Sequence, residues 1–281
     1  MTFLRIDGVP HHVRVEGSGP PVLLSAGLGM CWFDWDEVAA LLAPHRTVVR
    51  FDRPGHGLSG PAPAPPTASG EADRIAAVLD AAGVAGPVTV VGHSIAGFHA
   101  EAFARLHPDR TAALVLVDSS VEPDVRVPVA AGARVASARL AGAVLAGLGM
   151  PAAVGPLLRR ATVRLSRTGG GDPAARGLVR ECYRASRVWR GLLLENVRYR
   201  PVAAELLCLR DRFPLPPVGV TVLVGGAGGG GWVARQRDLG EVLGGVVRVV
   251  EGAGHLVMLD DAAAVARAVL TPAPPLPETP E

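Results

Sequence analysis

The chain lacks lysine and has few cysteines and aromatic residues. All 28 basic side chains of the 281 residues are arginine, and aromatic residues make up 4%. The three cysteines, Cys31, Cys182 and Cys208, are far apart and odd in number. This spacing excludes a disulfide framework and the C-x-x-C pattern of a metal site, so no metal site is expected.

Targeting and membrane signals are weak as well. The first residues show no basic region followed by an apolar run, which predicts no signal peptide and a cytoplasmic location. Residues 140–158 carry no charge and approach the length of a membrane span, but four glycines together with Pro151 and Pro156 interrupt them. We expect helices packed on a core and no integral membrane segment. A surface that rests on lipid or on an apolar substrate is the alternative.

Apolar segments alternate between strand-like and helix-like patterns, which predicts a parallel sheet with helices on both faces. Residues 2–6 and 11–16 are predicted to form an initial hairpin. The later strands are mostly unbroken apolar runs, at 21–26, 46–52, 87–92, 111–118, 220–225 and 246–251. The predicted helices are at 34–43, 70–83, 96–107, 232–243 and 260–270. The predicted fold class is therefore α/β, with a doubly wound, mostly parallel sheet of about eight strands.

The alternation stops between 119 and 216, where the pattern is helical and is broken by proline and glycine. We predict a helical lid there, inserted into a core formed by 1–118 and 217–270. The lid has 16 arginines and seven acidic residues, whereas the rest has 12 and 19. A basic lid could favour an anionic substrate or an acidic partner, but a solvated helical face explains the arginines equally. The five prolines of 271–281 predict a disordered tail.

The most informative motif is Gly92-His93-Ser94-Ile95-Ala96-Gly97, between a β-branched strand and a segment with helical apolar spacing. A serine among small residues at a strand-to-helix turn projects its hydroxyl from the edge of a parallel sheet. The following helix directs free N–H groups at the serine, which favours a nucleophile whose attack creates an oxyanion. Ala96 departs from the usual G-x-S-x-G pattern. Capping of the helix by Ser94 is the alternative role.

A serine hydroxyl needs a base within hydrogen-bond reach, and that base needs an orienting group. Among eight histidines, His255 stands out because it follows the last predicted strand in a glycine-bearing loop. The carboxyl ends of parallel strands gather at one edge of the sheet, so Ser94 and His255 are expected to face one crevice. An ordinary surface-loop histidine is the alternative.

Four motifs resemble the α/β-hydrolase family. They are the loop Leu24–Gly29 followed by Trp35, the segment Phe51–Ser59, the serine turn and the His255 loop. The resemblance covers nearly all of the chain outside the predicted lid. It implies that Phe51–Ser59 is a structural turn, so His56 within it is not our candidate base.

The resemblance also implies where an oxyanion would bind. One donor is the backbone N–H of Ile95, directly after the nucleophile, and the other is the N–H of Leu28. Backbone donors suit this role because the fold holds them in place. The chain departs from the family at Ala26, where histidine commonly precedes the glycine. That difference bears on the shape of the loop more than on its chemistry.

The chain departs most from the family pattern at the acid, the carboxylate that orients the catalytic histidine. The family places it after the next-to-last predicted strand, where this chain has Gly225–Gly231 and no carboxylate. Asp238 and Glu241 lie too far on, inside the next helix. Some relatives, certain haloalkane dehalogenases among them, take the acid from the end of the preceding strand. That position holds Asp118 here, and Glu122 is a second choice; a cap for the departing chain is the alternative role of Asp118.

These residues together predict a serine hydrolase that cleaves an ester or similar acyl bond through an acyl-enzyme, without a cofactor. The expected partner is a small molecule, apolar or anionic, and not a nucleic acid. A dehalogenase or epoxide hydrolase would need a carboxylate in place of Ser94. C–C bond or thioester hydrolysis and cofactor-free peroxidation stay open, since fold does not choose among them. A degenerate hydrolase that only binds a ligand is the remaining alternative.

Overall fold

The computed structural model describes residues 2–275. Its eight strands form one sheet in the order β1-β2-β4-β3-β5-β6-β7-β8. Pairing is antiparallel between β1 and β2 and between β2 and β4, and parallel from there on. This confirms the predicted α/β fold class. The strands are β1 (Thr2–Ile6), β2 (Val9–Glu16), β3 (Pro21–Ser25), β4 (Thr47–Phe51), β5 (Val88–His93), β6 (Thr111–Val117), β7 (Gly219–Gly225) and β8 (Val246–Val250).

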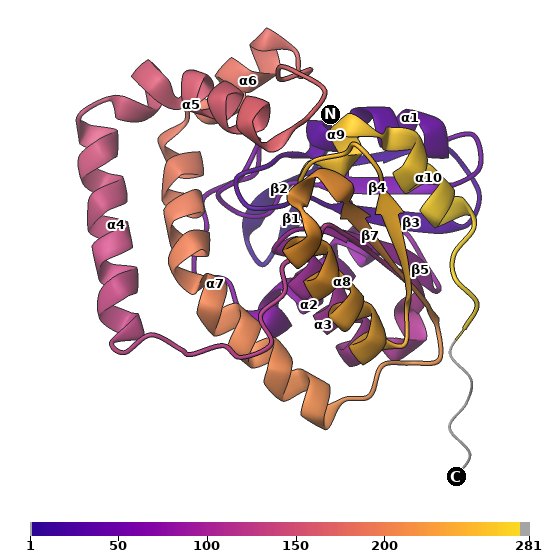
Figure 1. The fold of residues 1–281 in the computed structure, drawn as a ribbon. Coiled ribbons are helices and arrows are strands. Elements are labelled where there is room, and N and C mark those ends of the chain that lie inside the picture. The colour runs from indigo at the N-terminus through magenta and orange to yellow at the C-terminus, as the bar shows by residue number, and fades with distance from the viewer. Residues whose placement is uncertain (1, 276–281) are drawn as a thin grey trace.

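Helices cover both faces of the sheet (Figure 1). One face carries α2 (Ala68–Ala81), α3 (Ala96–Leu106) and α8 (Gly230–Leu243). The other carries α1 (Asp36–Leu42), α9 (Val257–Asp260) and α10 (Ala262–Leu270). Two hydrophobic cores result, one on each side of the sheet.

Strand β6 shows why the central strands read as unbroken apolar runs. Leu114 and Leu116 point into one core, while Val115 and Val117 point into the other, and all four are fully buried. Successive side chains of a strand point to opposite faces, so a strand covered on both faces has no solvent-facing side that would favour polar residues.

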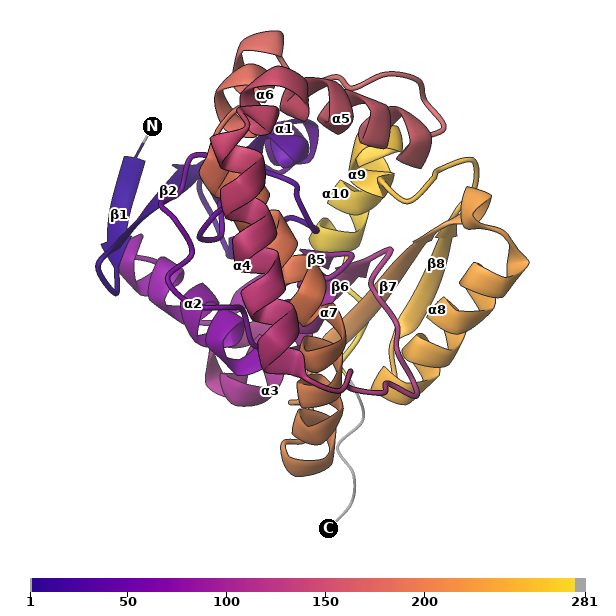
Figure 2. The same cartoon turned by 90° about the vertical axis from the view of Figure 1, so that its left-hand side faces the viewer.

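Four helices lie between β6 and β7. They are α4 (Ala131–Gly147), α5 (Met150–Ser166), α6 (Arg176–Tyr183) and α7 (Ser186–Arg212), and we refer to residues 131–212 as the helical insertion. Helix α7 packs on α2 and α3, and α4 packs on the opposite side of α7 (Figure 2). Because α4 contacts little else, only Ala138 and Gly142 of its residues are buried.

The uncharged stretch at 140–158 forms the corner between α4 and α5. The chain breaks at Gly149, whose φ of +69° is left-handed, and not at Pro156, which lies inside α5. Pro151 occupies the first turn of α5, where its missing N–H costs nothing. Within 2–275, no single helix is long and apolar enough to cross a membrane; α4 and α5 satisfy length and composition only as a pair bent by 105°.

The predicted disordered tail, 271–281, falls partly outside the described residues, which end at 275. Its first residues pack on the sheet. Ala273 is buried, and its backbone N–H donates to Thr221 Oγ1 of β7 over 3.3 Å. The chain therefore stays in contact with the core for several residues past α10.

Helix α3 carries His99, which is buried with neither ring nitrogen hydrogen-bonded among the described residues. Burial lowers the pKa of His99 from 6.5 to about 4. Between these pH values the unfolded chain binds a proton that the folded chain does not, so stability falls as pH falls. We expect this group to remove about 3 kcal/mol of unfolding free energy between pH 7.5 and pH 4.

Urea denaturation of His99→Leu across this pH range should therefore give a flatter dependence than the parent chain. The exposed His45 provides the control, because His45→Gln should leave the slope unchanged. Equal slopes for the parent and His99→Leu would contradict the assignment.

Candidate active site

Ser94 lies in the turn between β5 and α3 with a φ of +53°, a left-handed conformation that is unusual for serine. The turn needs small neighbours, because a Cβ at Gly92 would overlap the carbonyl oxygen of Ala96, and one at Gly97 would overlap Ser119 Oγ. Ala96 itself is the first residue of α3 and has no need of a positive φ. A methyl group is therefore compatible with this position.

His255 follows β8, and its ring meets a carboxylate from the end of β6. His255 Nδ1 and Asp118 Oδ2 are 2.6 Å apart. Asp118 is 2% exposed, and its Oδ1 accepts hydrogen bonds from Gly225 N and from Trp232 Nε1, each at 2.9 Å. The carboxylate is thus fixed by three partners, of which one is the histidine ring.

Sequence reasoning missed Trp232, although the residue directly follows the glycine run. The glycines give the indole and the His255 loop room to approach. A Cβ at Gly228 would lie 2.7 Å from Trp232 Cδ1, and one at Gly225 would overlap the carbonyl oxygen of Gly254. The run that lacks a carboxylate therefore supplies space and two hydrogen-bond donors to Asp118 instead.

His93 connects the serine turn to the His255 loop. Its Nε2 donates to the carbonyl oxygen of His255 over 3.0 Å, and the two rings lie 4.7 Å apart. Burial and the neighbouring His255 lower the pKa of His93 well below its ordinary value. A neutral His93 keeps its proton on Nε2 for this bond and adds no charge beside the His255 ring.

Ser94 and His255 open into one cavity of about 480 Å³, which Leu28 and Met30 also line. The helical insertion provides the opposite wall. That wall is mostly apolar and includes Gly155, Leu158, Val163, Tyr183, Val188, Trp189 and Leu192. Among the described residues, no hydrogen bond joins the Ser94 hydroxyl to His255; such bonds often tighten only when substrate is bound.

The two expected oxyanion donors have no acceptor among the described residues. Within residues 2–275, the backbone N–H groups of Leu28 and Ile95 donate to no other group of the chain. Leu28 lines the cavity, and Ile95 directly follows Ser94 at the start of α3. Their role as oxyanion donors stays a prediction.

A buried ion pair supports the loop that follows β3. Arg53 Nε and Nη2 lie 2.9 and 3.0 Å from the two carboxylate oxygens of Glu195, which belongs to α7. The same guanidinium donates to the carbonyl oxygens of Ala26 and Gly27. Although burial alone would raise the pKa of Glu195, Arg53 and His56 hold it far below its usual value. Sequence patterns gave no sign of this partnership.

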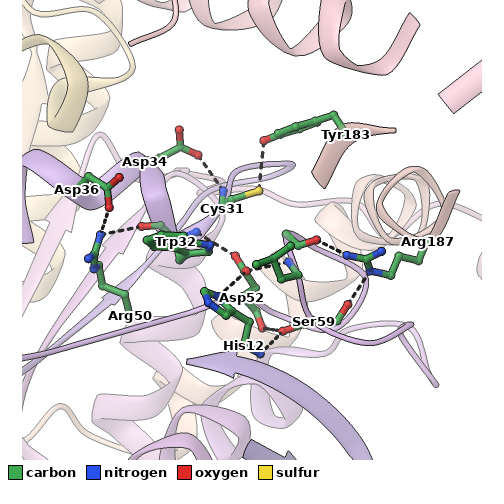
Figure 3. A network of polar contacts seen from close by, with 12 residues as sticks. His12, Cys31, Trp32, Asp34, Asp36, Arg50, Asp52, Ser59, Tyr183 and Arg187 are labelled. Carbon is green, nitrogen blue, oxygen red and sulfur yellow. Dashed lines mark hydrogen bonds and ion pairs between the residues drawn. The ribbon is translucent and has the colours of Figure 1, made fainter. Parts of the chain in front are cut away.

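The segment Phe51–Ser59 is held by its own polar network (Figure 3). Asp52 accepts hydrogen bonds from the backbone N–H groups of Trp32 and Leu58 at 2.9 and 3.0 Å. His56 is buried, and its Nε2 lies 3.2 Å from Glu195 Oε2. His56 does not line the cavity into which Ser94 and His255 open. The predicted structural role of this segment agrees with these contacts.

A second bond ties the insertion to the loop after β3. Tyr183 of α6 donates its hydroxyl to the carbonyl oxygen of Gly29 over 2.6 Å, and Cys31 Sγ is 3.4 Å from the same hydroxyl (Figure 3). Gly29 follows Leu28, so the insertion contacts this loop close to an expected oxyanion donor.

Sequence comparison identifies the family of the chain. Residues 22–268 match the family described as "Alpha/beta hydrolase family". The chain belongs to the alpha/beta hydrolase family. A structure of this family, the enol-lactonase from Burkholderia xenovorans, superposes with a TM-score of 0.68, 22% identity and coverage of 96% of this chain and 98% of that one. At this identity the likeness shows the fold alone.

Curated relatives of this alpha/beta hydrolase match over shorter segments. Lipase LipV of Mycobacterium tuberculosis is 41% identical over 115 residues, which cover 41% of this chain and 43% of the lipase. A putative carbamate hydrolase, RutD of Azorhizobium caulinodans, is 34% identical over 113 residues, 40% of this chain and 42% of the relative. The chain thus spans less than half the length of the curated relatives it matches.

The Arg53–Glu195 pair provides a test of how the hydrolase site is supported. Glu195→Gln leaves the Arg53 guanidinium buried without a counter-charge, which should lower the unfolding free energy by about 3 to 5 kcal/mol. Urea denaturation at neutral pH measures this loss. The exposed Glu181→Gln on α6 is the matched control and should change stability by less than about 0.5 kcal/mol. Equal, small effects of the two substitutions would show that the pair contributes little.

Proposed function

We propose that the chain is a serine hydrolase that cleaves an ester or a similar acyl bond. The observation that carries this proposal is the 2.6 Å contact between His255 Nδ1 and Asp118 Oδ2, next to a serine in a left-handed turn on one cavity. A histidine whose Nδ1 is held by a carboxylate presents Nε2 as a base, which is what a weakly nucleophilic hydroxyl requires.

In the proposed reaction, Ser94 Oγ attacks the substrate carbonyl carbon while His255 Nε2 accepts the hydroxyl proton. The tetrahedral intermediate collapses, the bond to the leaving group breaks, and His255 returns the proton to the departing oxygen. Water then attacks the acyl-enzyme with His255 again acting as base, which releases the acid and restores Ser94. Asp118 stabilises the imidazolium that forms in each half-reaction.

The negative charge on the carbonyl oxygen would be bound by the backbone N–H groups of Leu28 and Ile95. Leu28 lines the same cavity as Ser94, Ile95 directly follows Ser94, and neither N–H has a competing acceptor in residues 2–275. The Leu28 donor depends on the loop after β3, which Arg53 and Tyr183 hold through carbonyl oxygens. A preorganised loop suits this role because donors that need no reorganisation stabilise a developing charge most effectively.

The cavity wall favours an uncharged, apolar acyl or alcohol group. Its one lining arginine, Arg159, is already paired with Asp34 and Asp172, so it offers no free charge to a substrate. The anionic substrate that a basic lid could favour finds no counter-charge among the described lining residues. We expect the helical insertion to act as the lid that sets chain-length preference. A cytoplasmic location stays a prediction.

A series of p-nitrophenyl acyl esters tests the nucleophile. The chain should hydrolyse them, with a preference for apolar acyl groups, and Ser94→Ala should reduce the rate by about 10⁶-fold because triad members act as a unit. Ser119→Ala, which alters a buried neighbour of the turn, is a control for local damage. No turnover together with no labelling of Ser94 by a fluorophosphonate would favour a ligand-binding protein on a hydrolase scaffold.

The acid is tested separately. Asp118→Asn should lower kcat by about 10⁴-fold, since the amide favours the wrong histidine tautomer while keeping its shape. Glu122→Gln, the second candidate in the sequence, should leave kcat within about twofold, because Asp118 and not Glu122 contacts His255. A full rate in Asp118→Asn would remove Asp118 from the proposed triad.

A further inference from the structure

A second cavity lies on the other side of α5 from the active-site cavity. It has a volume of about 340 Å³ and is formed between α5 and α6. We call it the arginine groove; its lining includes Arg160, Arg176, Arg180, Arg184, Pro156 and Leu157. None of these residues lines the active-site cavity, which uses Gly155, Arg159 and Val163 of the same helix.

The arginines that support this part of the fold have carboxylate partners. Arg159 is paired with Asp34 and Asp172, and Arg167 with Asp260. In contrast, the four arginines of the groove take part in none of the ion pairs formed among residues 2–275. Arg176, Arg180 and Arg184 are exposed, so their charges are solvated and are not needed to hold the insertion together.

The like charges of the groove arginines destabilise α6 slightly. Arg176, Arg180 and Arg184 follow one another at intervals of four residues, so they share one side of α6 and repel each other. The chain has no acidic residue from 125 to 171, and Glu181 of α6 does not line the groove. Four cations thus converge on one hollow without a counter-charge from the groove itself.

We propose that the arginine groove binds a phosphate-bearing group, carried by a small phosphate ester or by a lipid headgroup. Guanidinium groups present their N–H donors as a planar fork that matches phosphate oxygens two at a time. Several such forks around one hollow fit a group with more than one negative charge. Pro156 and Leu157 provide an apolar surface for the organic part of the ligand.

Occupation of the groove would brace the wall of the active-site cavity. Helices α5 and α6 are in backbone contact, because a Cβ at Gly155 would overlap the carbonyl oxygen of Tyr183. A phosphate that bridges Arg160 with the arginines of α6 ties these helices together from the outer side. The proposal does not rest on hydrolase chemistry, since the two cavities share no described lining residue.

Isothermal titration calorimetry with inorganic pyrophosphate tests whether the ligand is a small phosphate ester. Co-sedimentation with phosphatidylcholine vesicles, with and without phosphatidylglycerol, tests the headgroup source. The groove variant carries both Arg180→Gln and Arg184→Gln. The charge-matched control carries Arg5→Gln and Arg237→Gln, which replace exposed arginines of β1 and α8. Ser94→Ala should bind like the parent chain, which separates this outcome from any failure of the proposed reaction.

We expect pyrophosphate to bind the parent chain and the control, and to bind the groove variant at least about tenfold more weakly. Vesicle binding that requires phosphatidylglycerol and the groove arginines, without pyrophosphate binding, would assign the lipid headgroup. Absence of binding to both probes overturns the proposal. The proposal is also overturned if the groove variant and the control lose binding equally, or if neither loses binding.

Discussion

The ion pair between Arg53 and Glu195 joins the two parts of the molecule on which the site depends. Arg53 extends from the segment after β4, and Glu195 comes from α7 of the helical insertion. Through its remaining donors, the same guanidinium fixes the carbonyl oxygens of the loop after β3. The guanidinium thus makes four hydrogen bonds, two to Glu195 and two to this loop. A buried charge is stable only when its partners are in place, so the loop and the insertion depend on each other.

The sheet supplies the rest of the geometry. Ser94, Asp118 and His255 come from the ends of β5, β6 and β8. His255 lies 137 residues beyond Asp118 in the sequence, but only one strand, β7, separates β6 from β8 in the sheet. The parallel register brings those ends to one edge. The insertion then covers that edge with an apolar wall, and its own polar contacts fix how the wall meets the core.

Sequence patterns were sufficient for the sheet and for the residues at strand ends. The unbroken apolar run of β6 and the glycine-flanked turn at Ser94 are local signals, and strand order places their ends together. Asp118, which the resemblance implied as the acid because some relatives carry it at this strand end, contacts His255. Trp232, Glu195 and Tyr183 could not be predicted, because each acts across a tertiary contact with no local pattern in the chain. The same holds for the arginine groove, whose composition was visible in the lid while its hollow was not.

The carboxylate at the end of β6 changes what the loop after β7 must be. With the charge carried by Asp118, this loop has to leave room for an indole and a neighbouring backbone, and a Cβ at Gly225 or Gly228 would intrude. Selection at these positions then acts on size instead of on ionisation. A side chain added in this loop would displace the indole or the backbone of the His255 loop, and with them the groups that hold Asp118 and its partner.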